Sequence, residues 1–334
     1  MTIQQQCISL DDPAAWQRAL SGIPHSFGHT WENCYAMHLT SGQRTYLYCL
    51  EHEDTRIVCP IAEREYDGAI DIVKPFGFSG FVGNGNWEEF QRHWKQFVRE
   101  RGYVCSYLGI NPVFDHGDSF EPAELFQYDT VHLLDLSQDM EELWRNLSTN
   151  RKRQLKDWQR INGNFVFQHE QLVDFFLENH RAFFSRKGAD QCYHFSDETL
   201  AFLFDCENVV LVGVGGAKGI EAVSVFAYTA DLGEYLFNVS LPEGRDHSVP
   251  LIWFGVNHLK HMGIPMLNLG GGRGGVGESK RRYGGRELPL RCIKQIYDDE
   301  RYHQLCRKAG VDPDDPGGYF PAYRKALHIG VKED

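Results

Sequence analysis

The chain has 334 residues, of which 42% are hydrophobic and 13% aromatic, with 34 Lys and Arg against 46 Asp and Glu. These values are typical of globular proteins and exclude a disordered, collagen-like or coiled-coil chain. At roughly 100–200 residues per domain, the length predicts about two domains. No apolar run approaches the roughly 18 residues that span a bilayer, and the first residues form no basic, apolar leader, so we expect a cytoplasmic protein without membrane insertion. Nine scattered cysteines with no Cys-x-x-Cys pair fit a reducing compartment.

The net charge of −12 is unevenly distributed. Residues 145–160 hold six basic residues and one acid, and residues 273–294 hold seven basic residues and two acids. A basic site on an otherwise acidic chain suits a phosphate-bearing ligand held at one place, because the acidic remainder opposes sliding along nucleic acid. The alternative is that both segments are solvated helix faces.

The first half of the chain predicts a hairpin, a helix and a strand in that order. Residues 45–62 contain two β-rich runs around a polar turn, as in a hairpin. A helix is predicted to begin after an N-cap at Asn86, because apolar residues recur at three- and four-residue steps, and to end at Gly102. Residues 103–112 then predict a strand.

The second half follows about 160 residues later, and we expect the order hairpin, strand, helix ending in glycine, strand in both halves. Residues 208–229 predict a hairpin and residues 233–241 a strand, followed by a helix over 249–261 that ends at Gly263. Residues 266–272 predict the strand after that helix. The repeat indicates a duplicated architecture without strong residue identity.

Further helices are predicted around the second pattern. Two amphipathic segments lie at 140–147 and 172–184, and acids first, bases last and a terminal glycine predict a helix over 298–310. We expect residues 1–138 to form a first domain, completed by residues 305–334, and residues 139–304 to form a second.

The glycine-rich segment 267–285 (LNLGGGRGGVGESKRRYGG) is the most unusual part of the chain. It satisfies the Gly-x-Gly-x-x-Gly spacing twice, but Gly284 and Gly285 interrupt the long helix that a dinucleotide site needs, and the phosphate-loop sequence is absent. Its composition predicts exposed backbone amides and close ligand approach, followed at once by a cluster of cations.

Three segments together resemble the FemABX family of peptidyltransferases, which contain two tandem GNAT-like domains. Residues 147–163 (LSTNRKRQLKDWQRING) resemble the basic helix that opens the second domain of the family. Residues 267–285 resemble its glycine-rich strand end with a following lysine, and residues 319–324 (YFPAYR) are similar to a tail found in GNAT-like relatives. The resemblance spans nearly the whole chain. It implies an α/β (α+β) fold of two tandem GNAT-like domains, each a mixed, mainly antiparallel sheet flanked by helices.

The resemblance implies acyl transfer, usually of an amino acid from aminoacyl-tRNA to an amine, with the catalytic lysine of the family at Lys280. An aminoacyl ester is already activated, so the enzyme mainly aligns the amine and stabilises the oxyanion of the tetrahedral intermediate. A lysine ammonium beside glycine amides suits that task. The alternative for Lys280 is an ordinary solvent-exposed cation.

The resemblance also suggests where each substrate binds. The donor phosphates are expected at Arg151, Lys152, Arg153, Lys156, Arg281 and Arg282, although the first four also fit the polar face of a helix. The glycine-rich loop comprises Gly270, Gly271, Gly272, Gly274, Gly275 and Gly277. The acceptor candidates in the first domain are Trp31, Tyr35, Phe76, Phe78, Ser79 and Asn111.

Two of these acceptor positions depart from the family pattern. Asn111 stands where the family often has aspartate, and Tyr35 stands where it often has lysine. An asparagine cannot act as a general base, and losing the lysine weakens the case for a diphosphate acceptor. We therefore expect the acceptor to be the amine of a small molecule or a peptide.

Two other functions stay open. An N-acyltransferase of the same fold could take its acyl group from acyl-CoA or a carrier-protein thioester. Residues 245–250 (RDHSVP) argue against CoA, because they depart from the pyrophosphate-binding loop of GNAT enzymes and Pro250 lacks an amide. A non-catalytic protein could instead bind a phosphorylated ligand at the basic segments.

We expect no cofactor besides the co-substrate and no metal. His258 and His261 lie three residues apart on a predicted helix, but no third ligand is placed. No local signature supports a cysteine or serine nucleophile.

Overall fold

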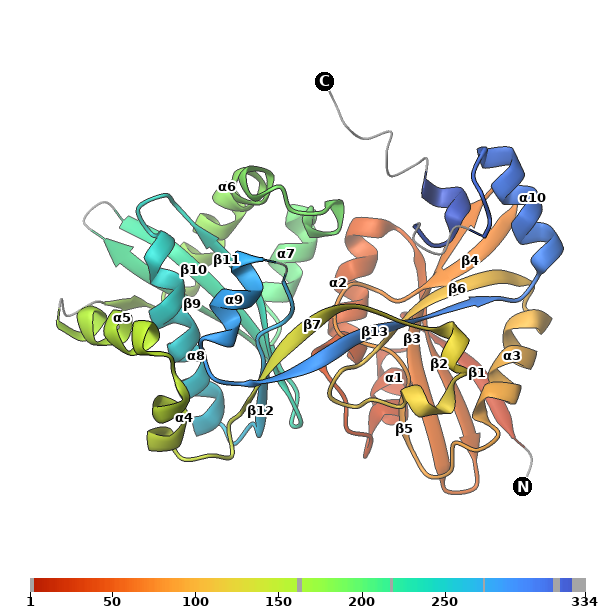
Figure 1. Ribbon diagram of the computed structural model, residues 1–334, viewed down its shortest axis with the longest axis horizontal. Coiled ribbons are helices and arrows are strands. Elements are labelled where there is room, and N and C mark those ends of the chain that lie inside the picture. Colours follow the sequence, from red (N-terminus) through yellow and green to blue (C-terminus); the bar gives the residue numbers. More distant parts are fainter. Residues whose placement is uncertain (1–2, 161–163, 217–218, 273, 315–318, 326–334) are drawn as a thin grey trace. The chain divides into compact units, whose positions relative to one another are not determined.

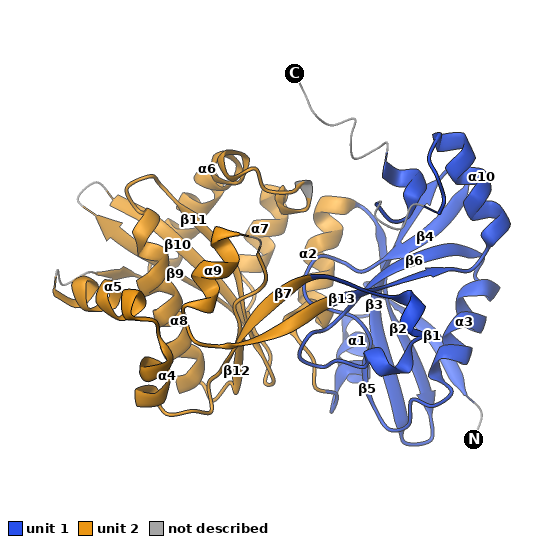
Figure 2. Ribbon diagram, viewed as in Figure 1, with its two compact units in different colours: residues 1–23, 42–128, 291–334 blue, residues 24–41, 129–290 orange. Residues whose placement is uncertain are grey.

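The computed structural model describes residues 3–160, 164–216, 219–272, 274–314 and 319–325. They form two compact units, coloured separately in Figure 2. Unit 1 comprises Met1–Ile23, Gly42–Tyr128 and Arg291–Asp334, and unit 2 comprises Pro24–Ser41 and Asp129–Leu290. The end of the expected basic helix, Arg273, and parts of the expected C-terminal tail lie outside the described residues.

Unit 1 contains a mixed sheet with strands from both ends of the chain (Figure 1). Its strands are β1 (Gln4–Ser9), β2 (Arg44–His52), β3 (Thr55–Tyr66), β4 (Ala69–Val73), β5 (Val82–Asn84), β6 (Tyr103–Ile110) and the end of β13 (Arg286–Ile296). They run in the order β1-β2-β3-β4-β6-β13, and β5 also pairs with β3. The β4–β6 pair is parallel and its neighbours are antiparallel.

Helices cover both faces of this sheet. α3 (Phe90–Glu100) buries Trp94 among the rings of Tyr48, Phe81 and Phe97. Its indole Nε1 donates to Gln295 Oε1 at 2.9 Å, which joins α3 to β13 in the core. On the other side, α10 (Asp299–Ala309) and the short helix η6 (Ala322–Arg324) share a buried cluster with β6, and α1 (Pro13–Leu20) contacts β1 and β3. The expected helix begins at Phe90 rather than directly after Asn86, because the Asn86 side chain accepts from the Glu88 amide in a turn.

The paired strands of unit 2 are also mixed in direction. Its strands are β7 (Leu125–Asp135), β8 (Phe165–Val166), β9 (Val209–Gly216), β10 (Gly219–Tyr228), β11 (Gly233–Ser240) and β12 (Met266–Asn268). They run in the order β7-β12-β11-β10-β9-β8, and the β11–β12 pair is parallel while its neighbours are antiparallel. The expected strand 266–272 is shorter in the structure, since the chain leaves the sheet after Asn268.

The helices of unit 2 lie on both faces of its sheet. α4 (Met140–Asn146), α5 (Thr149–Arg160) and α8 (Ser248–His261) share one core with the sheet, including Leu143, Leu155 and Val256. α6 (His169–Lys187) and α7 (Asp197–Phe204) contact the strands as well, and Phe176 of α6 packs on Phe237 of β11. The remaining helices are α2 (Trp31–Ser41), which packs on α7, and α9 (Gly275–Arg281).

The duplicated pattern predicted from the sequence is confirmed. Hairpin β2–β3, strand β4, helix α3 and strand β6 in unit 1 match hairpin β9–β10, strand β11, helix α8 and strand β12 in unit 2. In both patterns the helix joins the two parallel strands, as crossover connections do. The predicted α/β class, with mixed, mainly antiparallel sheets flanked by helices, is confirmed.

The bounds of the units differ from the expected division at residue 138. Residues 24–41 lie in unit 2, because α2 packs on α7 and Thr199 Oγ1 donates to the carbonyl of Ala36 at 2.8 Å. The chain enters unit 2 within β7, at Asp129, and returns to unit 1 within β13, at Arg291. Among the described helices, none is both long and apolar enough to cross a membrane.

The close packing of α8 on β10 gives a test of the unit 2 core. A Cβ on Gly255 would overlap the buried ring of Phe226, so Gly255→Ala should lower the free energy of unfolding by about 1–3 kcal/mol. Alanine is the better helix former, which works in the opposite direction by about 1 kcal/mol or less. Urea denaturation measures the difference. Asn257→Ala, at an exposed position of the same helix, is the control and should leave the midpoint nearly unchanged.

Candidate functional site

The glycine-rich loop lies against β7 in unit 2. The His132 amide donates to the carbonyl of Gly270 at 3.3 Å, and the Leu269 amide donates to the carbonyl of His132 at 2.9 Å. A Cβ on Gly271 would lie 2.9 Å from an Asp129 carboxylate oxygen and 3.0 Å from the backbone carbonyl oxygen of Thr130. The loop therefore passes close to the backbone of β7 at Gly271, where a larger residue would force its neighbours to shift.

The other glycines of the loop serve different local needs. Gly270, Gly272 and Gly274 have φ angles of 76°, 151° and 58°, a region that side chains rarely adopt. A Cβ on Gly277 would overlap the carbonyl of Gly272, so the loop folds directly onto the first turn of α9. Gly275 has open space around it and shows no such constraint.

Lys280 reaches back from the last turn of α9 to this loop. Its Nζ donates to the carbonyl of Gly271 at 2.5 Å, and the side chain is half-buried. Burial lowers the pKa of Lys280 to about 8, and the nearby Asp129 carboxylate opposes part of that shift. At pH 7 most of the Lys280 amine is thus protonated, and it lies beside the backbone of the glycine-rich loop.

His132 belongs to the same site, and sequence reasoning missed it. The side chain is 2% exposed, its Nδ1 has no hydrogen-bond partner among the described residues, and its Nε2 lies beside Gly277. Burial lowers the pKa of His132. The Glu287 carboxylate raises this pKa in part, whereas the positive charge of Lys280 lowers it further. The imidazole is therefore neutral at pH 7 and can accept a proton. Only the pairing of β7 with β12 brings His132 to the loop, and no local motif signals that pairing.

The expected donor residues on α5 fall into two groups. Arg151 is 6% exposed, and its guanidinium points inward to Ser279, which argues against a phosphate contact. Arg153 and Lys156 are exposed on the helix, whereas Lys152 is half-buried and donates to the carbonyl of Arg145. Lys152, Arg153 and Lys156 stay predicted phosphate contacts.

Arg281 and Arg282 are paired with acids. Arg281 contacts Glu278 and Glu287, and Arg282 contacts Glu278 at 3.2 Å. All four side chains are at the surface, where solvent weakens ion pairs. Exchanging these carboxylates for phosphates would cost little, so both arginines stay predicted donor contacts.

The expected acceptor residues belong to different units. In unit 1, Asn111 is fully buried, where its side-chain amide donates to the carbonyl of Phe78 at 2.8 Å and its oxygen accepts from the amides of Val113 and Phe114. Phe76 and Phe78 are half-buried, and Ser79 is buried.

Trp31 and Tyr35 lie on α2 in unit 2 instead. They stack on each other at 4.8 Å between ring centroids, and both contact Phe202 of α7. An acceptor role for Trp31, Tyr35 and the four unit 1 residues stays a prediction.

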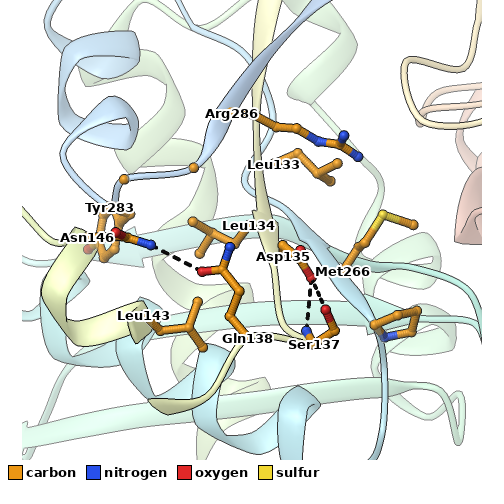
Figure 3. A pocket seen from close by; sticks show the side chains of 13 residues that line it. Leu133, Leu134, Asp135, Ser137, Gln138, Leu143, Asn146, Met266, Tyr283 and Arg286 are labelled. Atoms are coloured by element: carbon orange, nitrogen blue, oxygen red, sulfur yellow. Dashed lines mark hydrogen bonds between the residues drawn. The ribbon is translucent and has the colours of Figure 1, made fainter. Parts of the chain in front are cut away.

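A pocket of about 440 Å³ lies beside the segment that follows α9. Apolar side chains such as Leu134, Leu143 and Met266 form its walls, and Figure 3 shows Gln138 and Asn146 hydrogen-bonded on one side. Asp135 is bonded to Ser137 on another side. Its lining includes neither Lys280 nor His132, so both side chains lie outside this pocket.

Comparisons with known structures identify the fold. The FemX crystal structure matches with a TM-score of 0.69, over 90% of this chain and 99% of FemX, at 8% identity. The chain has a FemX-like fold. L-PGS from Bacillus licheniformis matches with a TM-score of 0.56, over 87% of this chain and 93% of that chain, at 11% identity.

The C-terminal domain of a putative lysylphosphatidylglycerol synthetase from Agrobacterium fabrum is also similar, with a TM-score of 0.55, over 92% of this chain and 99% of that domain, at 12% identity. No protein-family model and no curated protein matches the sequence. The predicted resemblance to FemABX proteins and their tandem GNAT-like fold is thus confirmed at the level of the fold.

The lowered pKa of Lys280 predicts a defined pH dependence of stability. Below pH 8 the amine is protonated in both the folded and the unfolded chain. Between pH 8 and 10.5 the unfolded chain holds a proton that the folded chain has lost, so stability rises with pH in this window. Relative to Lys280→Met, the wild type should gain up to about 1.4 kcal/mol per pH unit there, measured by urea denaturation from pH 7 to 10.

Lys187→Met provides the control for this measurement, since Lys187 is exposed at the end of α6. Its difference from the wild type should stay constant over the same pH range. A constant difference for Lys280→Met as well would show that the Lys280 amine is not desolvated in the folded protein.

Proposed function

We propose that the protein is an N-acyltransferase that moves an aminoacyl group from aminoacyl-tRNA to the amine of a small molecule or peptide. One observation carries the proposal: the Lys280 ammonium is held against the backbone of the glycine-rich loop, in a fold similar to that of FemX. The name of a second group of similar structures, lysylphosphatidylglycerol synthetase, also states an aminoacyl product. The exposed cations of α5 support a donor that carries phosphates.

In the proposed reaction the acceptor nitrogen attacks the ester carbonyl, and a C–N bond forms. The C–O bond to the tRNA ribose then breaks, and the ribose oxygen takes up the proton that the amine has lost. Lys280 stabilises the negative oxygen of the intermediate, because its ammonium is desolvated and already oriented by the Gly271 carbonyl. No metal or redox group enters this balance.

Lys280→Ala tests the proposed centre. Removing one oxyanion donor typically costs about 3–4 kcal/mol of transition-state stabilisation, so turnover should fall at least about a hundredfold. The assay follows radiolabel from aminoacylated total tRNA into a panel of amines and short peptides. Lys187→Ala is the matched control and should keep full turnover. Near-normal turnover of the Lys280→Ala protein would contradict the assignment of Lys280 as the catalytic residue.

Binding of total tRNA across a salt series tests the donor class separately, with acetyl-CoA as competitor. A phosphate-contacting site loses roughly 0.7–0.9 log units of affinity per contact and per log unit of salt. We expect a slope of several contacts and no competition by acetyl-CoA. Binding of CoA or its thioesters without tRNA binding would instead identify a thioester-dependent acyltransferase.

A further inference from the structure

Arg151 lies at the start of α5, among the residues expected to contact donor phosphates, yet its guanidinium is turned into the protein. We propose that Arg151 is a positioning residue, which ties α5 to the last turn of α9 and thereby holds the Lys280 amine inside the site. The inference rests on the proposed function only for the role of Lys280 in the reaction.

Outside its own helix, the guanidinium of Arg151 contacts one short segment of chain around Lys280. Its Nη2 donates to the carbonyl of Ser279 at 2.9 Å and to the Ser279 hydroxyl at 2.5 Å. The guanidinium also covers the ring of Tyr283, at 4.9 Å from the ring centroid. Its Nη1 donates back to Gln154 on α5 at 2.8 Å, which fixes the plane of the group. Ser279 immediately precedes Lys280, so the two hydrogen bonds from Arg151 to Ser279 hold the backbone from which the lysine extends.

α9 needs such a tie because little else in its own sequence stabilises it. It has seven residues, whereas isolated helices shorter than about 12–15 residues are marginal in water. Its N-cap is Gly274, which offers no capping side chain. The helix is also followed by Gly284 and Gly285, which add conformational freedom to the unfolded chain. The buried guanidinium of Arg151 holds the last turn of α9 in place, which the sequence of α9 does not do by itself.

The position of α9 in turn sets the environment of the Lys280 amine. Its Nζ contacts Gly271 only while the last turn of α9 faces the loop. The charged and titratable groups around this point come from four elements: Asp129 and His132 of β7, Arg151 of α5, Glu278 and Arg281 of α9, and Glu287 of β13. If α9 loosens, water reaches the amine and its pKa returns toward 10.5.

Competitive acetylation measures the pKa of the Lys280 amine directly and needs no substrate. Trace acetic anhydride is added between pH 6 and 11, and mass spectrometry measures labelling of the Lys280 peptide against a reference amine. Arg151→Met and Arg151→Lys should both raise the pKa of Lys280 by about one unit or more. The lysine variant keeps the positive charge but lacks the second nitrogen that bonds Gln154 and the planar group that covers Tyr283, so it separates geometry from charge. Ser279→Ala should cause a smaller rise, and Ser279→Thr should restore the wild-type value.

Arg153→Met is the matched control, since Arg153 is exposed on the same helix. It should leave the Lys280 pKa unchanged. In the transfer assay, Arg151→Lys should lower kcat about tenfold, move the high-pH limb of the profile with the Lys280 pKa, and leave KM for tRNA within about twofold.

The opposite pattern would overturn the proposal: an unchanged Lys280 pKa in the Arg151 variants, with a raised KM for tRNA and a salt slope smaller by about one contact, makes Arg151 a phosphate contact. Should Arg151→Met not fold, Ser279→Ala and Arg151→Lys decide the matter alone. A raised Lys280 pKa together with no transfer activity in any protein, wild type included, would support the tie and refute the proposed function.

Discussion

The site depends on a backbone approach that leaves no room for side chains. The glycine-rich loop crosses β7 where a Cβ on Gly271 would lie 3.0 Å from the carbonyl oxygen of Thr130, and it folds onto α9 where a Cβ on Gly277 would overlap the carbonyl of Gly272. This contact brings the carbonyl of Gly271 within reach of the Lys280 amine and places His132 below the same loop. The two lowered pKa values follow from it, because the tight packing removes water from both side chains.

Much of the fold could be predicted from the sequence, since the signals were local. The repeated order of hairpin, strand, helix and strand follows from turn residues, apolar periodicity and the terminal glycines of α3 and α8. The extent of each unit could not be predicted in the same way. α2 joins unit 2 through contacts with α7, such as the bond between Thr40 and Thr199, which lie 159 residues apart in the chain. Periodicity within α2 contains no information about that partner.

The candidate site likewise combines residues that the sequence indicates with residues that only the folded chain brings together. Lys280 and its glycines form one continuous segment, so composition identified the segment, and the resemblance to the FemABX family indicated the lysine within it. His132 comes from a strand that is paired only in the folded chain, and its burial is invisible in the sequence. Arg151 differs from its neighbours in a way that the sequence does not reveal. It sits among basic residues that favour a phosphate interpretation, but Arg153 and Lys156 face solvent while Arg151 faces Ser279 and Tyr283. The position of each residue around the helix axis, rather than its charge, determines whether its side chain faces solvent or the protein interior.

The way the strand order of unit 1 is completed affects how the chain folds as it is made. β6 pairs with β4 on one edge, but its partner on the other edge, β13, follows nearly all of unit 2 in the chain. Until β13 has been synthesised, β6 has an unpaired edge, Trp94 lacks the partner Gln295, and α10 cannot cover its face of the sheet. Open strand edges are sites of wrong pairing between chains. The half of the protein that leaves the ribosome first is therefore the last to close its core, and the later half can fold before it.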